Sequence, residues 1–337
     1  MIKKYSKLIS SLLASGFLVF SLQGCQSKTS DYADTQRLTQ SAQISDNTAA
    51  NQENYSDNSS DSPGSRLSYD KSDTQYTTPD DFSQMRDGKN YGESQVVSYY
   101  SSTVGRYRNA NVILPYNYDS SKSYPVLYLL HGMGGNYMAW EAFGCKYTVQ
   151  NAVEDYGRSD MIIVCPTVFT SVSGEAEDGY SFSELTEQYD NCLEDIVNDL
   201  MPYINENFST KTGRDYTAIA GFSLGGREAL YAGYSHPELF GYIGAFSPVH
   251  GVIPSPSSTG ISLPSLLDDL SVDASIGQPY LNLLVVGYDD PFCLFAAEFY
   301  DSYMTEHGID HIFYEMEGAH DANVWSSGLY NFARRIF

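Results

Sequence analysis

The stretch 216–232, Tyr-Thr-Ala-Ile-Ala-Gly-Phe-Ser-Leu-Gly-Gly-Arg-Glu-Ala-Leu-Tyr-Ala, decides the fold of this chain. A short β-prone run precedes a Gly-x-Ser-x-Gly motif centred on Ser223, and a helix-forming run follows it. Strand, sharp turn and helix are the setting of a nucleophile elbow, in which the serine hydroxyl stands on a strained turn. Gly221 and Gly225 keep a Cβ out of that turn. Because the motif also occurs by chance, a catalytic Ser223 requires suitable partners elsewhere in the chain.

Buried strands are predicted on both sides of this unit. Continuous apolar runs at 125–130, 160–166 and 281–286 are typical of strands covered on both faces. Further strands are expected at 96–101, 106–115, 242–247 and 311–316, and helices at 145–156, 182–207, 294–306 and 323–336. Residues 248–277 are expected to be a loop with a short helix near Leu266. This alternation over residues 94–337 predicts one α/β domain, a three-layer sandwich around a mostly parallel central sheet.

Candidate partners of Ser223 lie at the carboxyl ends of predicted strands, where sheets of this kind bind ligands. A serine nucleophile needs a base, and the base needs an acid that orients it. The chain order Ser223, Asp290, His320 is that of the α/β-hydrolase fold. Among the six histidines, His250 is the one competitor of His320 as the base. Asp289 competes with Asp290 as the acid, and triad geometry alone does not separate the two.

Other candidate site residues follow from the chemistry of acyl transfer. The oxyanion of a tetrahedral intermediate needs N–H donors. The backbone of Leu224, directly after the nucleophile, is one candidate donor, and Met133 in the glycine turn 131–135 is the second. Trp140 and Phe292 are candidate contacts of an aromatic substrate, and each is equally consistent with a core position. No Cys-x-x-Cys spacing in the sequence indicates a metal, and neither a metal nor a cofactor is expected.

The N-terminus has the pattern of an export signal. A basic start is followed by the short apolar run 8–20, and residues 22–25, Leu-Gln-Gly-Cys, resemble a bacterial lipobox. We therefore predict a signal peptide over residues 1–25, with lipidation of the Cys25 thiol. Ordinary secretion is the alternative, because Gln23 is less usual than a small residue at that position. The protein is expected outside the cell, held at the bacterial surface by a lipid anchor, its only predicted contact with the membrane.

Residues 26–93 are rich in Ser, Asp, Asn, Thr and Gln, a composition that predicts a disordered linker. A chain starting near Ser94 is therefore expected to fold by itself. The net charge of −23 argues against a nucleic-acid partner, whose phosphates would repel the protein.

Besides Cys25, the sequence has four cysteines, and in an exported protein these four can pair in three ways. They are Cys145, Cys165, Cys192 and Cys293. Because Cys165 lies in an apolar strand, we expect it to be a buried thiol instead.

Four blocks of this sequence resemble carbohydrate esterase family one, and most closely the feruloyl esterase modules of bacterial xylanases and cellulosomal enzymes. The blocks are Tyr124-Pro-Val-Leu-Tyr-Leu-Leu-His-Gly-Met-Gly-Gly135, Ala218-Ile-Ala-Gly-Phe-Ser-Leu-Gly-Gly226, Gly287-Tyr-Asp-Asp290 and Gly318-Ala-His-Asp-Ala-Asn-Val-Trp-Ser-Ser-Gly-Leu-Tyr-Asn-Phe332. The likeness covers about residues 96–337, but the loop 249–277 matches no motif. In that family the acid stands three residues after the glycine, which implies Asp290.

The resemblance also implies an activity: metal-free serine hydrolysis of acyl groups on plant xylan. The expected enzyme releases feruloyl groups from arabinoxylan, and its partners are plant cell-wall polysaccharide or oligosaccharide esters. An acetylxylan esterase is the alternative, because the same family includes both activities. A carbohydrate-binding surface protein with an inherited esterase fold is the non-enzymatic alternative.

Overall fold

The structure is a computed structural model that describes residues 73–257, 260 and 262–337. The predicted signal peptide, Cys25 and the predicted linker up to residue 72 lie outside the described residues. Within the described part of the chain, every helix is too short or too polar to cross a lipid bilayer.

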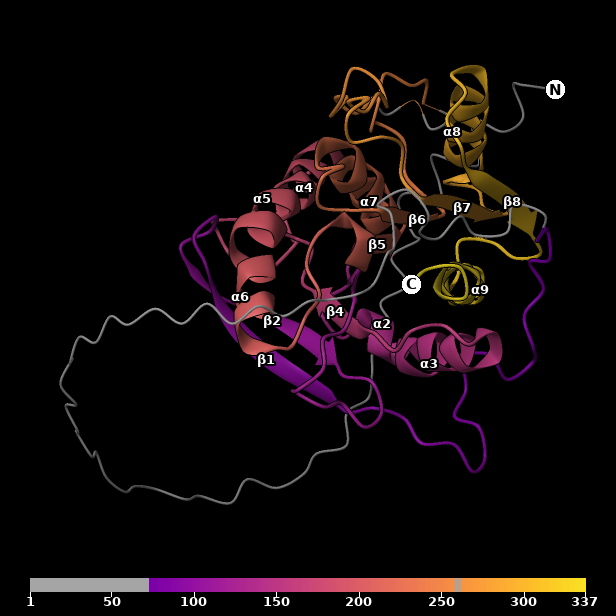
Figure 1. Cartoon of the computed structure of the whole chain (residues 1–337). Helices are drawn as coiled ribbons and strands as arrows, with labels where there is room; N and C mark the ends of the chain where they lie inside the picture. Colours follow the sequence, from indigo (N-terminus) through magenta and orange to yellow (C-terminus); the bar gives the residue numbers. More distant parts are fainter. Residues whose placement is uncertain (1–72, 258–259, 261) are drawn as a thin grey trace. The chain divides into compact units, whose positions relative to one another are not determined.

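An eight-stranded sheet forms the centre of the described chain (Figure 1), with strand order β1-β2-β4-β3-β5-β6-β7-β8. The strands are β1 (Ser94–Ser101), β2 (Arg106–Ile113), β3 (Val126–Leu130), β4 (Ile162–Pro166), β5 (Thr217–Phe222), β6 (Tyr242–Phe246), β7 (Leu281–Gly287) and β8 (Ile312–Met316). The pairs β1–β2 and β2–β4 are antiparallel, and all other neighbours in this sheet are parallel. The predicted mostly parallel sheet is confirmed.

Helices cover both faces of the sheet and complete the three layers (Figure 1). They are α2 (Ala139–Ala142), α3 (Cys145–Tyr156), α4 (Phe182–Asp190), α5 (Cys192–Asp195), α6 (Met201–Asn207), α7 (Leu224–Ser235), α8 (Leu294–Glu306) and α9 (Ala322–Ala333). Leu127 and Leu129 of β3 face the core shared with α3 and α9. Tyr128 and Leu130 face the opposite core, shared with α4 to α7. The alternation explains why the central strands are apolar throughout.

Two segments differ from their predicted form. The predicted helix 182–207 is divided into α4, α5, the π-helical segment η2 (Ile196–Leu200) and α6. Pro202 has no N–H to donate to the carbonyl four residues earlier, and the π segment lies directly before it. The short helix expected near Leu266 is absent from the described loop, because the Leu266 N–H donates to the carbonyls of Gly251 and Val252 instead.

The domain begins earlier than residue 94, because residues 73–93 pack against it. Phe82 is 7% exposed and belongs to the core between the sheet, α3 and α9. The Tyr76 ring stacks on Tyr314 of β8 at a centroid distance of 4.3 Å. Asn151 of α3 donates its side-chain amide to the Phe82 carbonyl at 3.0 Å. Assigning residues 73–93 to a disordered linker was therefore wrong, since a few aromatic anchors suffice to hold a mostly exposed polar segment against the domain.

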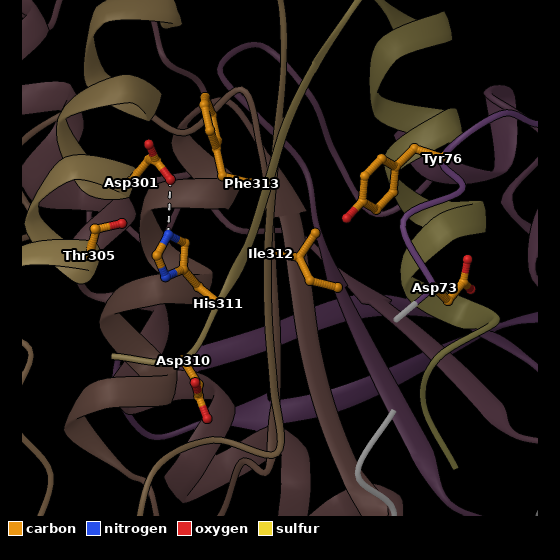
Figure 2. Close-up of a pocket in the computed structure, with 8 residues that line it drawn as sticks. All are labelled: Asp73, Tyr76, Asp301, Thr305, Asp310, His311, Ile312 and Phe313. Atoms are coloured by element: carbon orange, nitrogen blue, oxygen red, sulfur yellow. Dashed lines mark hydrogen bonds and ion pairs between the residues drawn. The ribbon is translucent and has the colours of Figure 1, made fainter. Parts of the chain in front are cut away.

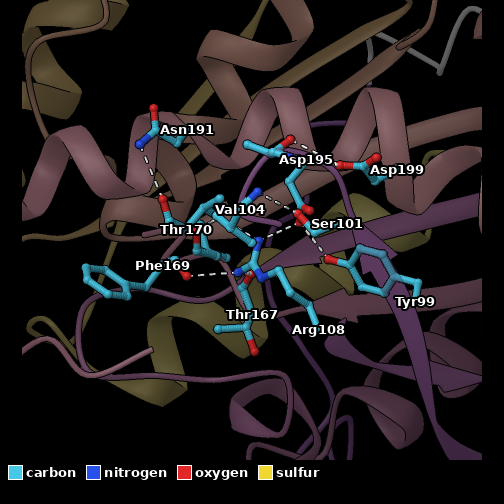
Figure 3. Close-up of polar contacts among 12 residues, drawn as sticks. Tyr99, Ser101, Val104, Arg108, Thr167, Phe169, Thr170, Asn191, Asp195 and Asp199 are labelled. Atoms are coloured by element: carbon cyan, nitrogen blue, oxygen red, sulfur yellow. Dashed lines mark hydrogen bonds and ion pairs between the residues drawn. The ribbon is translucent and has the colours of Figure 1, made fainter. Parts of the chain in front are cut away.

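A buried arginine fixes the loop that follows β4 (Figure 3). Arg108 of β2 donates one guanidinium nitrogen to Asp195 Oδ2 at 2.5 Å and to Thr170 Oγ1 at 2.8 Å. Its other terminal nitrogen donates to the carbonyls of Thr167 and Phe169 at 2.7 and 2.8 Å. Burying an ion pair is costly unless further hydrogen bonds are made, and here three further donations from Arg108 accompany its pair with Asp195. The network holds residues 167–170 at the carboxyl end of the sheet.

Candidate active site

Ser223 lies on the turn between β5 and α7 with φ 57° and ψ −123°, a conformation that non-glycine residues rarely adopt. The turn is held by close backbone contacts on both sides. A Cβ on Gly221 would lie 2.3 Å from the Gly225 carbonyl oxygen, and a Cβ on Gly225 would lie 2.4 Å from that of Leu130. Any side chain at Gly221 or Gly225 would therefore clash with the neighbouring backbone, so both positions require glycine. The turn presents Ser223 at the carboxyl end of the sheet.

Three of the predicted residues meet here in one hydrogen-bonded chain. His320 Nε2 lies 3.0 Å from Ser223 Oγ, and His320 Nδ1 lies 2.8 Å from Asp290 Oδ2. Asp290 follows β7, and His320 follows the neighbouring strand β8. Such a chain can take a proton from a serine hydroxyl and stabilise the resulting imidazolium.

The environment of Asp290 favours its charged form. Its Oδ1 accepts hydrogen bonds from the backbone N–H groups of Phe292 and Cys293, both at 2.9 Å. Burial acts to raise the pKa of Asp290, but the hydrogen bond and charge of His320 and these two N–H donors outweigh it. The pKa of Asp290 therefore lies below its ordinary value of 3.8, and the carboxylate is available to orient the imidazole.

The competing residues occupy other places. The side chain of Asp289 is exposed, while that of Asp290 is buried against His320. Asp321 caps α9 by accepting from the N–H groups of Asn323 and Val324. His250 is 7% exposed, and it is His320 whose ring lies at hydrogen-bond distance from Ser223. The geometry thus separates candidates that the sequence left open.

The segments that carry the predicted oxyanion donors lie beside Ser223. Leu224 is the first residue of α7, so its N–H is one of the helix's free N-terminal donors. A Cβ on Gly132 would lie only 2.8 Å from the Ser223 Cβ, which places the turn with Met133 against the nucleophile. The Met133 side chain itself is 53% exposed. The turn therefore brings a peptide group, and not a buried side chain, to the serine.

The two aromatic candidates have different positions. Trp140 is 1% exposed, and its indole N–H donates to the Leu130 carbonyl at 3.0 Å. Its role as a substrate contact is therefore wrong: a ring buried this deeply beneath the sheet edge is a core residue. Phe292 is 60% exposed, and its ring stands edge-on to His320 at a centroid distance of 5.7 Å. An exposed ring beside the base can contact a substrate.

Sequence reasoning assigned no role to Trp325 of α9. Its indole stacks on Phe222, the residue before Ser223, with centroids 4.2 Å apart and an interplanar angle of 13°. It also stands edge-on to His320 at 5.1 Å. Trp325 thus links the segments that carry Ser223 and His320. Its signals in the sequence were its spacing of five residues after His320 and its place in the block 318–332 that carries the family resemblance.

One group in the described chain has donor atoms close enough for a metal ion. Asp290, Cys293 and His320 offer one ligand atom each within 4.8 Å of one another. Burial holds the pKa of the Cys293 thiol well above its ordinary value, so the thiol stays protonated. Asp290 and His320 are already hydrogen-bonded to each other. These donors therefore fit a proton-transfer chain better than a cation site.

The four cysteines of the described residues form no disulfide. Cys145, Cys165, Cys192 and Cys293 are all free and buried, as expected for Cys165 from its strand. None of the three possible pairings is formed among these residues.

A cavity of about 400 Å³ lies apart from these residues, beside β8 and α8 (Figure 2). Its polar lining includes Asp301, Asp310 and His311, and His311 Nε2 lies 3.0 Å from Asp301 Oδ1. None of the predicted site residues lines it. The cavity therefore carries no argument about ester chemistry.

Comparisons with known proteins identify the family of the chain. The sequence model of the family described as "Putative esterase" matches residues 101–277. A CE1 ferulic acid esterase from Anaeromyces mucronatus, solved in complex with ferulic acid, is 32% identical with a TM-score of 0.72; the match covers 78% of this chain and 97% of that one. Together these findings define a carboxylic ester hydrolase of α/β-hydrolase type. The chain belongs to the Esterase family, together with the CE1 ferulic acid esterases.

Curated relatives include enzymes of two specificities. An endo-1,4-beta-xylanase/feruloyl esterase from Xylanibacter ruminicola is 33% identical over 173 residues, which are 50% of this chain and 23% of that protein. An acetyl esterase from Caldicellulosiruptor saccharolyticus is 26% identical over 267 residues, 70% of this chain and 94% of that protein. The chain spans 23% and 43% of the length of the first curated relatives that it matches.

Proposed function

We propose that this chain is a serine esterase that releases feruloyl groups from the arabinoxylan of plant cell walls. The observation that carries the proposal is the hydrogen-bonded chain from Ser223 through His320 to Asp290, in a member of the family that includes the CE1 ferulic acid esterases. In this proposal the reaction uses groups of the chain itself and requires no added cofactor.

Acylation begins when Ser223 Oγ attacks the ester carbonyl and His320 Nε2 takes its proton. Asp290 accepts a hydrogen bond from the Nδ1–H of His320, which keeps the proton on Nδ1 and the Nε2 lone pair directed at the serine. The Met133 and Leu224 N–H groups donate to the oxyanion of the tetrahedral intermediate. His320 then gives its proton to the leaving sugar alcohol. Water repeats the cycle on the acyl-enzyme and releases the acid.

The preference for an aromatic acyl group rests on Phe292. Its ring is exposed, yet the backbone N–H of the same residue is bound to Asp290 Oδ1 at 2.9 Å. The phenyl group is therefore tied to the acid loop and stands beside His320. A flat ring that packs on it places an ester near Ser223, and such positioning helps only if the carbonyl is then aligned for attack.

The test is release of ferulate and of acetate from feruloylated arabino-oligosaccharides and acetylated xylo-oligosaccharides under matched conditions. We expect kcat/KM to be much higher for the feruloyl esters, and Ser223→Ala to abolish the release of both acids. Phe292→Ala should lower kcat/KM roughly fivefold on feruloyl esters, with little change on acetyl esters, because one aromatic contact contributes about 1 kcal/mol. Faster acetate release by the wild type would reject the feruloyl assignment and leave the serine chemistry intact.

An acetylxylan esterase is the second candidate, and the similarity to an acetyl esterase over 94% of that enzyme's length favours it. The non-enzymatic alternative, a carbohydrate-binding protein, predicts that a fluorophosphonate probe does not label Ser223. Labelling of the wild type, but not of Ser223→Ala, would reject it.

We further propose that the enzyme is exported and lipid-anchored through Cys25 at the cell surface, on the basis of residues 1–25. Cys25→Ala should release the protein from membranes without changing its specific activity. Incorporation of labelled fatty acid into the wild type and not into the variant is the measurement, and equal membrane retention of both would contradict the anchor.

A further inference from the structure

The carbonyl oxygen of Gly132 receives hydrogen bonds from three directions. His131 Nδ1 lies 2.7 Å from it, the Tyr189 hydroxyl 3.0 Å and the Gly135 N–H 3.1 Å. A carbonyl in a turn ordinarily accepts one or two bonds. The concentration of donors on this one oxygen, directly before Met133, requires a reason.

The His131 imidazole is held in one tautomer. The N–H of Val168 donates to His131 Nε2 at 2.8 Å, so Nε2 carries a lone pair and the ring proton is on Nδ1. Burial lowers the pKa of His131 to about 4, and the ring is neutral at working pH. His131 Nδ1–H is therefore a donor to the Gly132 carbonyl. The loop that positions Val168 is the one that Arg108 fixes through Thr167 and its neighbours.

The Tyr189 hydroxyl of α4 is a second donor to the Gly132 carbonyl. Tyr189 is fully buried, and burial together with the nearby charge of Glu177 holds its pKa well above the ordinary value, so it keeps its proton. Glu177 Oε1 also lies 2.8 Å from this hydroxyl, so the one hydroxyl proton is shared between the Gly132 carbonyl and the carboxylate. Glu177 accepts from the Gly134 N–H as well, which lies 3.0 Å from both of its carboxylate oxygens. Glu177 and Tyr189 thus hold the glycine turn from the side remote from the serine.

Fixing the Gly132 carbonyl also fixes the Met133 N–H. In a planar trans peptide the C=O and the N–H point in opposite directions, and the described residues contain no cis peptide bond. Donors that pull the Gly132 oxygen to one side therefore turn the Met133 N–H to the other. They also polarise the peptide, because hydrogen bonds to a carbonyl strengthen the N–H of the same amide as a donor.

We propose that Tyr189, held by Glu177, is a positioning residue that aims and polarises the Gly132–Met133 peptide as an oxyanion donor. This inference rests on the proposed function, since it assigns a role to residues outside the Ser223–His320–Asp290 chain in the same reaction. Tyr189 touches neither substrate nor nucleophile. It acts through the peptide, and its contribution is made when negative charge develops on the ester oxygen.

The test compares Tyr189→Phe with Tyr234→Phe. Both changes remove one buried hydroxyl; that of Tyr234 accepts from Asn282 at 2.9 Å, in a contact that involves no residue of the proposed reaction. We expect Tyr189→Phe to lower kcat roughly tenfold with KM within about twofold, as for loss of one hydrogen bond that strengthens in the transition state. Tyr234→Phe should leave both constants unchanged. An aryl boronic acid, whose tetrahedral adduct mimics the oxyanion, should bind Tyr189→Phe more weakly by the same factor.

Variants of Glu177 give a second measurement. Glu177→Ala should lower kcat, and Glu177→Gln should restore most of it, because an amide oxygen can still accept from Gly134. Equal kcat and equal boronic acid affinity of Tyr189→Phe and wild type would overturn the inference. So would a fall in kcat without weaker boronic acid binding, which would indicate only a loosened fold. A wild type active on acetyl but not feruloyl esters would leave this inference standing, whereas a wild type inactive on every ester would refute both.

Discussion

Replacing Asp290 by asparagine should reverse the tautomer of His320. Asp290 Oδ1 accepts the N–H groups of Phe292 and Cys293, both at 2.9 Å, while Oδ2 faces His320 Nδ1. An asparagine keeps its oxygen on the two backbone donors and places its NH₂ where Oδ2 was. His320 Nδ1 must then accept a hydrogen bond, and its proton moves to Nε2, the atom that lies 3.0 Å from Ser223 Oγ. A protonated Nε2 cannot take the serine proton.

The expected loss of kcat is large because His320 can no longer act as the base, although the rest of the site is unchanged. A wrong tautomer of this kind lowers kcat by about 10⁴ in serine proteases, and we expect a similar factor for Asp290→Asn. Since each tenfold decrease in kcat corresponds to about 1.4 kcal/mol, the activation free energy rises by about 5.5 kcal/mol. Both backbone hydrogen bonds at position 290 survive, so thermal stability should change little. Some catalysis should remain from the N–H groups of Met133 and Leu224.

The assay is steady-state hydrolysis of methyl ferulate, with Asp289→Asn as the matched control. Asp289 is exposed and one residue away, so its amide variant removes the same charge without contact with His320. Asp289→Asn should be nearly silent. If Asp289→Asn were the damaging change, or if Asp290→Asn kept more than about a tenth of wild-type kcat, the reasoning from tautomers would be refuted.

Burial raises the pKa of Glu228 to about 8, although Arg227 lies 2.6 Å away and opposes the shift, while Asp190 adds to it. The protonated carboxyl is favoured on folding, so its contribution to stability is full below the unfolded pKa of about 4.3 and is lost as pH rises through about 8. Glu228→Gln should flatten the fall of Tm over this range, and parallel Tm curves for variant and wild type would contradict the assignment. Phe82→Ala should reduce the free energy of unfolding by about 3–5 kcal/mol in denaturant titrations. The control is Met85→Ala, which should hardly change the free energy of unfolding because Met85 is 66% exposed. If Phe82→Ala and Met85→Ala lowered the free energy of unfolding equally, residues 73–93 would not stabilise the domain.

The sequence predicted the sheet and the meeting of Ser223, Asp290 and His320 because both depend on local patterns. Apolar runs fix which segments become central strands, and loops at the carboxyl ends of parallel strands meet at one edge. The choice of Asp290 over Asp289 came from a resemblance, because adjacent residues in a loop have no periodicity to separate them. The structure separates them by burial and by the bond to His320.

What the sequence left open depends on contacts between distant segments. Trp140 follows the glycine turn, as a substrate contact would, and its burial and the acceptor at Leu130 identify it as a core residue. Residues 73–93 have a disordered composition, yet Phe82 is buried by helices that lie far along the chain. Tyr189 carried no motif at all. Its contact with the Gly132 carbonyl spans 57 residues of sequence and is formed only by the packing of α4.

The stack of Trp325 on Phe222 and against His320 gives the molecule an optical reporter. The chain has two tryptophans, and one of them is in van der Waals range of the imidazole that gains and loses a proton in the proposed mechanism. An imidazolium quenches indole emission more strongly than a neutral imidazole, so the fluorescence of Trp325 follows the charge of the base. Trp140 is sealed in the core and supplies a constant background. Protonation of the site is therefore open to stopped-flow spectroscopy without any added dye.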